Sequence, residues 1–169
     1  MKFILKLKHW QAFIFIMIGV ILSNFTVENN SSVTTVIRIV GIVLYFLWPF
    51  LVGNGLYHYL PERIELNYNL FVINSGLWLT IYLAAMIISD GQGITFTGVY
   101  VLLMFYVIYA VLNYLAFPAQ LLKSLEVGKK ARLSDYIGDF FLVAFLPIGI
   151  WFLQSRVNKI VDNQASYNE

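Results

Sequence analysis

The chain has 169 residues, of which 60% are hydrophobic and only 12% are charged, and its formal net charge is +2. A soluble domain keeps about a quarter of its residues charged, so this composition excludes an ordinary soluble protein and predicts an integral membrane protein. The lack of cysteine excludes disulfides, thiol nucleophiles and cysteine metal ligands. The small net charge indicates no nucleic-acid partner, and the length fits a single membrane domain over residues 1–169.

Four apolar segments are long enough to be membrane-spanning helices, because the ~30 Å core of a bilayer requires ~17–25 apolar residues. They cover residues 10–25, 36–57, 70–89 and 96–117. Three lysines precede the first segment, as in a signal peptide, but residues 23–26 are a poor cleavage site, which favours an uncleaved first span. The predicted fold class is an all-α membrane bundle of four spanning helices, followed by a fifth apolar segment.

The distribution of Lys and Arg predicts the orientation, because cations are retained on the cytoplasmic side of a membrane. With the N-terminus inside, the tail before the first span, the loop with Arg63 and the loop after the fourth span all lie inside. Before the last apolar segment only Arg38 lies outside, at a helix end where its long side chain reaches the interface. Many Ile, Phe, Tyr and Asn residues with few Ala fit an AT-rich bacterial genome. The predicted location is therefore a bacterial inner membrane, with the N-terminus in the cytoplasm.

The fifth apolar segment, residues 137–154, leaves two alternatives open. Its uninterrupted apolar block, residues 140–153, is fourteen residues long, which is typical of re-entrant or interfacial segments. Pro147 removes a backbone donor and Gly149 loosens the chain, so together they favour a bend. If the segment returns, ten of the eleven Lys and Arg residues lie inside. Proline is nevertheless tolerated in spanning helices, so a fifth span that puts the C-terminus outside stays open.

Polar residues inside the four spans are uncharged. Their interiors hold no Asp, Glu or Lys, which argues against a proton-coupled pump and against an intramembrane aspartyl protease. The intramembrane candidates are Asn54, Asn74 and Asn113. Asn113 shares a helical face with Tyr106 and Tyr109, which favours interhelical hydrogen bonds, with a lipid or small-molecule pocket as the alternative.

Asn54 lies in the sequence Gly53-Asn54-Gly55, shortly after Pro49. A helix break at such a sequence frees backbone carbonyl groups, which form an ion site when another helix covers them. The more ordinary interpretation is a kink near the end of a span. No second repeat with a matching break accompanies it, which weakens the ion-site hypothesis.

A cytoplasmic N-terminus places two histidines and several carboxylates at the inner membrane face. The candidates there are His9, His58, Glu62, Asp135 and Asp139. Imidazole and carboxylate groups bind metals, and they also contact lipid headgroups. These residues come from separate loops without a ligand spacing such as H-x-x-H, which favours interface anchoring and ion pairing between loops. The sequence predicts no catalytic residue, no metal site and no cofactor.

The C-terminal part contains Asp135-Tyr136-Ile137-Gly138-Asp139-Phe140-Phe141 and Pro147-Ile148-Gly149-Ile150-Trp151, with Lys123-Ser124-x-Glu126 upstream. This pattern resembles the C-terminal signature of a family of short, uncharacterised bacterial membrane proteins of the Bacteroidota type. The family more often has proline where this chain has Ser155. The resemblance implies a multi-span bacterial membrane protein and carries over no catalytic role.

The leading functional hypothesis is a non-enzymatic inner-membrane protein that binds a protein partner or a lipid, in an accessory, assembly or immunity-like role. It rests on the small size of the chain and on its uncharged spans. A small transporter or channel subunit is the first alternative, with Asn54 and Asn113 along its path. A membrane enzyme that acts on lipid headgroups through the inner-face residues is the second. The expected partners are the lipid bilayer and either a membrane protein or a second copy of the chain.

Overall fold

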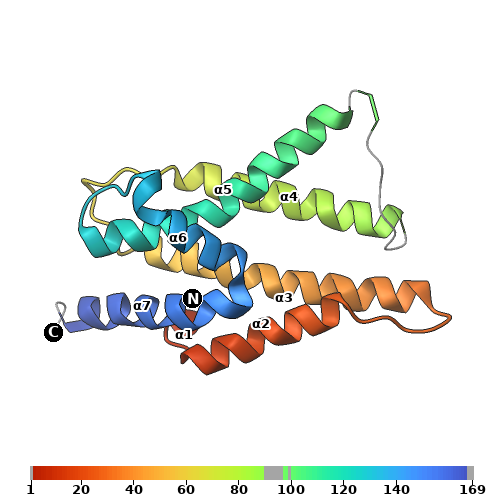
Figure 1. Ribbon diagram of the computed structural model, residues 1–169, viewed down its shortest axis with the longest axis horizontal. Helices are drawn as coiled ribbons and strands as arrows, with labels where there is room; N and C mark the ends of the chain where they lie inside the picture. Colours follow the sequence, from red (N-terminus) through yellow and green to blue (C-terminus); the bar gives the residue numbers. More distant parts are fainter. Residues whose placement is uncertain (1, 90–96, 99, 167–169) are drawn as a thin grey trace.

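A computed structural model describes residues 2–89, 97–98 and 100–166 of the chain. The regular structure within these residues is entirely α-helical (Figure 1): α1 (Lys2–Leu5), α2 (His9–Ser23), α3 (Ser31–Tyr57), α4 (Tyr68–Ile88), α5 (Tyr100–Val127), α6 (Leu133–Ala144) and α7 (Leu146–Ser166). This is the helical membrane bundle that the composition predicts, because a helix satisfies its backbone hydrogen bonds within the bilayer.

Among the described residues, three helices, α3, α4 and α5, are long and apolar enough to cross a membrane. They correspond to the predicted spans at 36–57, 70–89 and 96–117, although residue 96 lies outside the described residues and α5 continues to Val127. The first predicted span forms α2, which is apolar but has only 15 residues. A helix of that length is about 22 Å long, so α2 is shorter than the bilayer core.

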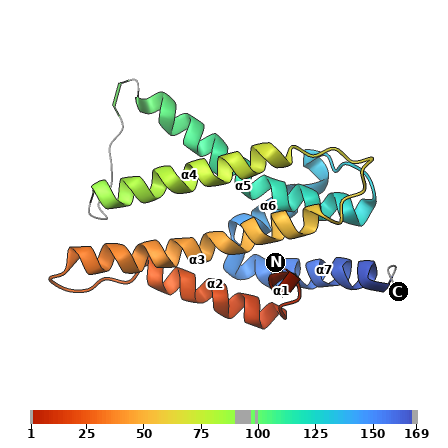
Figure 2. The same cartoon turned by 180° about the vertical axis from the view of Figure 1, so that it is seen from behind.

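The helices α2 to α5 run in alternating directions, and their connections gather at two ends of the molecule (Figure 1, Figure 2). The loop 24–30 lies at one end. The loops 58–67 and 128–132 and the C-terminal part of α7 lie at the other. We call this second end the basic end, because its described residues include Arg63, Lys129, Lys130, Arg132 and Lys159.

The helices α2 and α3 cross at two glycines, which let their backbones approach closely. A Cβ at Gly41 would lie 2.2 Å from the backbone nitrogen of Ser23 and 2.7 Å from the carbonyl oxygen of Gly19. A Cβ at Gly19 would lie 2.9 Å from the backbone nitrogen of Tyr45. Lipid tails are as apolar as side chains, so helices in membranes associate through such close packing of small residues.

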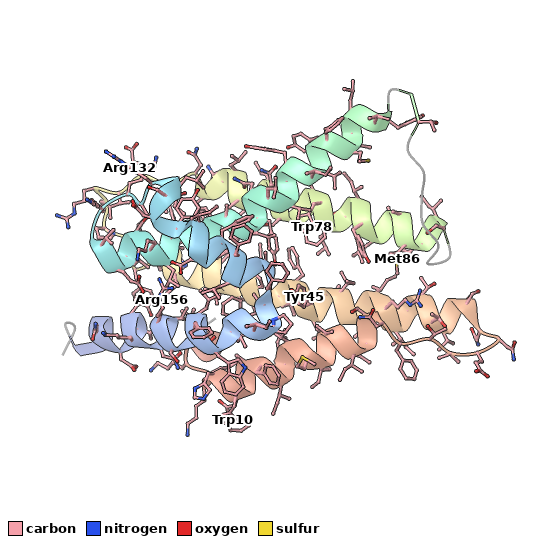
Figure 3. The ribbon with its side chains drawn as sticks, viewed as in Figure 1. Trp10, Tyr45, Trp78, Met86, Arg132 and Arg156 are labelled. Carbon is pink, nitrogen blue, oxygen red and sulfur yellow. The ribbon has the colours of Figure 1, made fainter. Side chains whose placement is uncertain are left out.

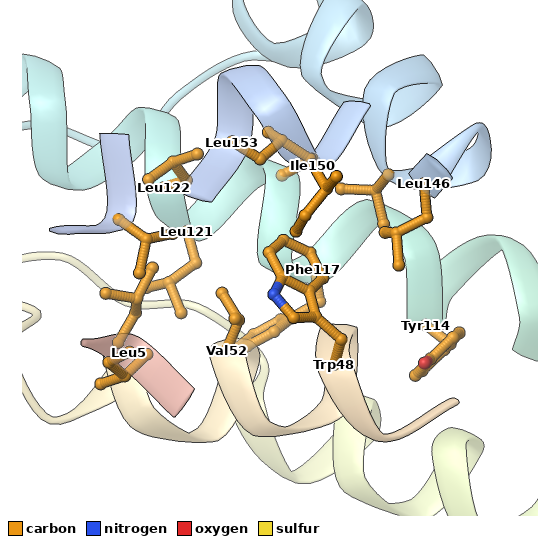
Figure 4. Close-up of a cluster of buried hydrophobic side chains, with 14 of the residues drawn as sticks. Leu5, Trp48, Val52, Tyr114, Phe117, Leu121, Leu122, Leu146, Ile150 and Leu153 are labelled. Carbon is orange, nitrogen blue, oxygen red and sulfur yellow. The ribbon is translucent and has the colours of Figure 1, made fainter. Parts of the chain in front are cut away.

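The hydrophobic core lies where the side chains of α7 meet those of α3 and α5 (Figure 4). The helix α7 buries a stripe of apolar residues three or four positions apart: Leu146, Ile150, Leu153, Val157 and Val161. The buried residues on the facing helices include Trp48, Val52, Phe117, Leu121 and Leu122. This packing joins the C-terminal part of the chain to the spanning helices.

Away from this core, the long helices carry large apolar side chains on their surface. Ile87 and Ile88 at the end of α4 are 63% and 78% exposed, and Leu102 and Phe105 of α5 are 69% and 62% exposed. A contiguous surface of this kind is unfavourable in water and ordinary in lipid. The exposed side chains therefore support a membrane location for these helices.

The fifth apolar segment does not form one helix. The helix α6 ends at Ala144, Phe145 leaves the helical conformation with φ −101° and ψ 54°, and α7 begins at Leu146. The start of α6 and the end of α7 both lie at the basic end, so the chain enters the bundle and turns back (Figure 1, Figure 2). This is the geometry of a returning segment. We call residues 133–166 the hairpin.

The turn of the hairpin depends on close packing between α6 and α7. Pro147 lies in the first turn of α7, where its missing N–H removes no helical hydrogen bond. Gly149 is required for space, because a Cβ there would lie 1.9 Å from the carbonyl oxygen of Leu142. The hydroxyl of Tyr45 on α3 lies near the backbone of Leu146, at the tip of the hairpin.

The helix α3 continues without interruption through Pro49 and the Gly53-Asn54-Gly55 sequence. The helix break that the ion-site hypothesis requires is therefore absent from α3, and that hypothesis loses its basis. The two glycines make room for neighbouring side chains instead. A Cβ at Gly53 would lie 2.7 Å from Cζ of Phe71, and a Cβ at Gly55 would lie 2.7 Å from Cδ1 of Leu5.

Candidate functional site

A cavity of about 270 Å³ lies between the N-terminal end of α4, the middle of α5 and the first turn of α6. Its polar lining consists of Asn67, Asn113, Gln120, Lys130 and Tyr136. An apolar groove of about 300 Å³ between α5 and α6 shares Asn113 and Ala116 with this cavity. The groove is lined further by Leu112, Leu133, Ile137 and Phe140. We call the cavity and the groove together the crevice.

The loop 128–132 is fixed on α5 by two side chains, and this sets the position of Lys130. Gln120 donates a hydrogen bond from Nε2 to the carbonyl oxygen of Ala131 at 3.0 Å. The hydroxyl of Ser124 accepts a hydrogen bond from the Ala131 N–H, also at 3.0 Å. Gly128 adopts a left-handed conformation with a φ of +67°, which ends α5 and lets the loop turn back along it.

Three side chains of the crevice carry hydrogen-bond donors that no described residue uses. No carboxylate in the described part of the chain pairs with the ammonium group of Lys130. Asn113 accepts a hydrogen bond through Oδ1, so its own amide N–H groups remain available. A tyrosine hydroxyl keeps its proton at neutral pH, and burial raises the pKa of Tyr136 further. Such a group of donors suits a phosphate or carboxylate oxygen.

Behind the crevice, Arg156 of α7 joins carboxylates from two other helices. Its Nη2 lies 2.8 Å from Oδ2 of Asp139 on α6, and its Nε lies 2.6 Å from Oε1 of Glu126 on α5. Hydrogen bonds to Asp139 and then to Glu126 raise the pKa of Arg156 above its usual value. We call these three residues the latch, because they tie the hairpin to α5.

The remaining inner-face candidates lie apart from one another in local roles. His9 at the start of α2 packs against Trp151, with ring centroids 5.0 Å apart. His58 follows the last residue of α3, and Glu62 is exposed in the loop 58–67. Within the described ranges, no three histidine or carboxylate side chains come together as metal ligands.

Asp135 stabilises the start of α6. Its Oδ2 accepts a hydrogen bond from the backbone N–H of Arg132 at 2.9 Å, across the first turn of the helix. The N-terminal end of a helix leaves backbone donors without partners, and an acidic residue in the first turn satisfies one of them. Asp139, one turn further along α6, belongs to the latch.

The intramembrane candidate Asn54 joins α3 to α4. Its Nδ2 donates a hydrogen bond to the carbonyl oxygen of Phe50 at 2.7 Å, and its Oδ1 accepts a hydrogen bond from the hydroxyl of Tyr68. Asn54 is 5% exposed, so both ends of its amide are buried with partners. The arrangement is one of helix packing.

The other two intramembrane candidates join α4 to α5. Asn74 is fully buried, and its Nδ2 donates to Oδ1 of Asn113 at 3.2 Å. The hydroxyl of Tyr106 donates to Oδ1 of Asn74 at 3.0 Å. These are the interhelical hydrogen bonds that the sequence favours, and they place Asn113 at the junction between the polar cavity and the apolar groove.

Gln154 is a buried polar residue that the sequence pattern does not single out. Its Oε1 accepts a hydrogen bond from Nε1 of Trp48 at 2.9 Å, and its Nε2 lies 3.1 Å from the carbonyl oxygen of Leu7 and 3.2 Å from that of Ile4. Gln154 therefore ties α7 to α3 and to the segment at and after α1. The available signal is its position four residues after Ile150, on the apolar face of α7.

In the sequence, Lys130 is an orientation signal only, and Gln120 and Tyr136 have no predicted role. These residues come from α5, α6 and the loop between them, so no short motif indicates that they line one cavity. Comparisons with protein-family models, with curated proteins and with solved structures gave no match to this chain. The resemblance of the C-terminal part to a Bacteroidota family therefore stays a prediction.

Proposed function

We propose that this protein is a non-enzymatic membrane protein that binds an anionic phospholipid in the crevice. The observation that carries the proposal is the change along the crevice from hydrogen-bond donors to an apolar groove, with Asn113 and Ala116 at the junction. A phospholipid presents the same order of groups, since an anionic phosphate is followed by an acyl chain. Ligand sites commonly combine an apolar lining with a few placed polar groups.

The donor end of the crevice suits the phosphate. Lys130 supplies a positive charge that no described carboxylate neutralises, and Tyr136 and Asn113 supply uncharged donors. A hydrogen bond to a charged group contributes about 1.5–3 kcal/mol. The interaction of Lys130 with a phosphate is therefore the largest single contribution that we expect at this end.

The apolar end suits an acyl chain. Leu112, Leu133 and Ile137 line the groove and are 48%, 62% and 41% exposed, so their side chains are available to a ligand. The latch and the packed stripe of α7 hold α6 beside α5, which keeps the two walls of the groove together. A preformed groove lowers the entropic cost of ordering a chain.

The orientation that we propose places the basic end in the cytoplasm of a bacterial inner membrane, together with the N-terminus. The loops 58–67 and 128–132 and the end of α7 carry cations at one end of the molecule, and the loop 24–30 carries none. Cations are retained on the cytoplasmic side, which supports this orientation. Anionic lipids of that leaflet then meet the donor end of the crevice.

A lipid titration tests the proposal. Purified protein in a neutral detergent is titrated with phosphatidylglycerol or phosphatidylcholine, and bound lipid is counted by native mass spectrometry. We expect the anionic lipid to bind more tightly, and Lys130→Ala to weaken its binding about tenfold, equivalent to about 1.4 kcal/mol. Equal affinity for the two lipids contradicts the proposal.

The matched control is Lys129→Ala. Lys129 precedes Lys130 and carries the same charge, but it does not line the crevice. We expect Lys129→Ala to leave binding within about twofold of wild type, because general attraction to an exposed cation is screened by salt. An equal loss of lipid affinity in Lys129→Ala and Lys130→Ala would mean that the attraction is nonspecific, and it would exclude the crevice as the binding site.

The apolar end is tested by Ala116→Phe, which fills the junction between the cavity and the groove. We expect this variant to weaken both lipids, since it blocks the chain and leaves the donors in place. A membrane protein partner, a second copy of the chain, a transport role and a headgroup enzyme stay predictions, because no contact among the described residues favours one of them.

A further inference from the structure

A second cavity lies between α3, α4 and α5 and is bounded toward the hairpin by Ala144. Its volume is about 240 Å³, and a cavity of about 210 Å³ between α4 and α5 shares Trp78, Tyr82 and Val111 with it. We call the two together the aromatic cavity. It shares no lining residue with the crevice, so a ligand in the aromatic cavity would bind independently of the proposed phospholipid.

One wall of the aromatic cavity is a cluster of rings from three helices. The ring centroids of Phe46 and Tyr114 are 4.8 Å apart and nearly parallel, and those of Phe46 and Trp78 are 5.5 Å apart and steeply inclined to each other. Tyr82 lies one turn further along α4, and its ring centroid is 6.1 Å from that of Trp78. Flat rings packed in these geometries favour a flat, aromatic or conjugated ligand over a flexible chain.

One buried polar group of this wall has no hydrogen-bond partner among the described residues. The hydroxyl of Tyr114 donates to the carbonyl oxygen of Phe46 at 2.7 Å, and the hydroxyl of Tyr45 lies near the backbone of Leu146. The indole N–H of Trp78 is buried and has no hydrogen-bond partner among the described residues. Tyr45 and Trp78, labelled in Figure 3, come from α3 and α4 and line the same cavity. A buried donor without a partner is unfavourable, and an oxygen acceptor on a ligand would satisfy it.

The aromatic cavity is accessible from the lipid-facing surface. Met104 and Ile108 of α5 line its outer part and are 40% and 43% exposed. The helix α5 diverges from α4 toward the end opposite the basic end (Figure 1). A ligand dissolved in the bilayer therefore reaches the cavity sideways, without crossing water.

We infer that the aromatic cavity binds a flat, lipid-soluble carbonyl compound of the quinone class, whose oxygen accepts a hydrogen bond from the indole N–H of Trp78. The ring of such a compound packs against the aromatic wall, and Trp78, which lines both parts of the cavity, supplies the donor. The two connected cavities together fall within the usual size of ligand sites, about 300–1,000 Å³.

The test compares two probes of nearly the same shape, 2-methyl-1,4-naphthoquinone and 2-methylnaphthalene, of which only the first carries carbonyl oxygens. Each is distributed by equilibrium dialysis between micelles that contain the protein and micelles that do not. We expect wild type to bind the quinone about tenfold more tightly than the hydrocarbon, once partition into empty micelles is subtracted. Equal affinities overturn the inference.

Trp78→Phe keeps an aromatic ring and removes the donor, so it should abolish most of the preference for the quinone while leaving hydrocarbon binding unchanged. Trp10→Phe, on the exposed face of α2, is the matched control and should retain the preference. Val111→Phe fills the part shared by both cavities and should displace both probes. A preference that survives Trp78→Phe contradicts the assignment of the donor.

The variants also report on folding, because phosphatidylglycerol binding at the crevice uses none of these residues. A Trp78→Phe protein with the circular dichroism spectrum and heat unfolding profile of wild type is folded, and its quinone binding then decides the question. Failure at the aromatic cavity with retained lipid binding overturns this inference alone. Failure of lipid binding in wild type, with the quinone preference present, overturns only the proposed function.

Discussion

The side chain of Arg156 has partners seventeen and thirty residues away in the chain, Asp139 and Glu126. Buried charges are stable where they are paired and hydrogen-bonded. Loss of one partner leaves the other as an unpaired charge in apolar surroundings. The Asp139 side chain is only 11% exposed, whereas that of Glu126 is 28% exposed. The two carboxylates therefore depend on Arg156 to different degrees.

We predict that Arg156→Gln lowers the free energy of unfolding by about 2–3 kcal/mol, because the buried carboxylate of Asp139 loses its countercharge. Glu126→Gln should lower it by about 1 kcal/mol or less, since water reaches Glu126 and Arg156 keeps Asp139. Unfolding by sodium dodecyl sulfate in mixed micelles, followed by circular dichroism, measures both changes.

Lys159→Gln is the control for the latch. Lys159 lies three residues after Arg156 on the same helix and is exposed, and no described carboxylate pairs with it. We expect this substitution to change the unfolding free energy by no more than about 0.5 kcal/mol. If Arg156→Gln is no more destabilising than Lys159→Gln, the latch does not hold the hairpin.

At the scale of elements, the hairpin depends on the missing side chain of Gly149. The backbone of Leu142 occupies the place that a Cβ would take, and backbone atoms in a helix have little freedom to move aside. Gly138 on α6 offers the comparison, because a Cβ there meets no atom within 4 Å. The two glycines therefore predict opposite responses to the same substitution.

We predict that Gly149→Ala destabilises the protein by at least about 1–3 kcal/mol, the usual effect of forcing atoms into a packed site. Gly138→Ala should be neutral or should stabilise the protein by up to about 1 kcal/mol, because alanine favours a helix more than glycine does. Heat unfolding in detergent measures both variants. Equal stability of the two variants would mean that α6 and α7 do not pack as closely as described.

At the scale of the whole molecule, the hairpin places the end of α7 at the same end of the molecule as the loop 58–67 (Figure 1), which predicts that both lie on one side of the membrane. The alternative of a fifth span puts these two segments on opposite sides. The natural chain has no cysteine, so single cysteines report on each segment without background. The loop 24–30 supplies a reference for the opposite side.

We predict that a membrane-impermeant maleimide added to intact spheroplasts labels Glu28→Cys and leaves Glu62→Cys and Lys159→Cys unlabelled. After the membrane is permeabilised, all three variants should react, because their positions are exposed in the fold. Labelling of Lys159→Cys from outside, with Glu62→Cys protected, would exclude the returning hairpin. Labelling of Glu62→Cys and Lys159→Cys, with Glu28→Cys protected, would reverse the proposed orientation.

The sequence predicts the roles of some residues and not of others. The sequence predicts that Asn74 and Asn113 form interhelical hydrogen bonds, because a polar side chain in a span needs a partner on a neighbouring helix. The structure pairs them with each other. The alternative of a helix break at Gly53-Asn54-Gly55 fails because glycine also serves close packing, and only the position of Phe71 shows which use applies. The crevice cannot be predicted from sequence, because Lys130 and Asn113 line one cavity but come from separate segments of the chain.

The sequence by itself determined that this is a helical membrane protein, because hydropathy and segment length are properties of neighbouring residues and suffice to select lipid as the solvent. It left the course of residues 137–154 open, since their length and composition suit both a crossing and a return. The tertiary structure showed that the segment folds back on itself as a hairpin, with Gly149 against the backbone of Leu142 and Arg156 paired with two other helices. Such contacts depend on the three-dimensional path of the chain, which no local pattern specifies.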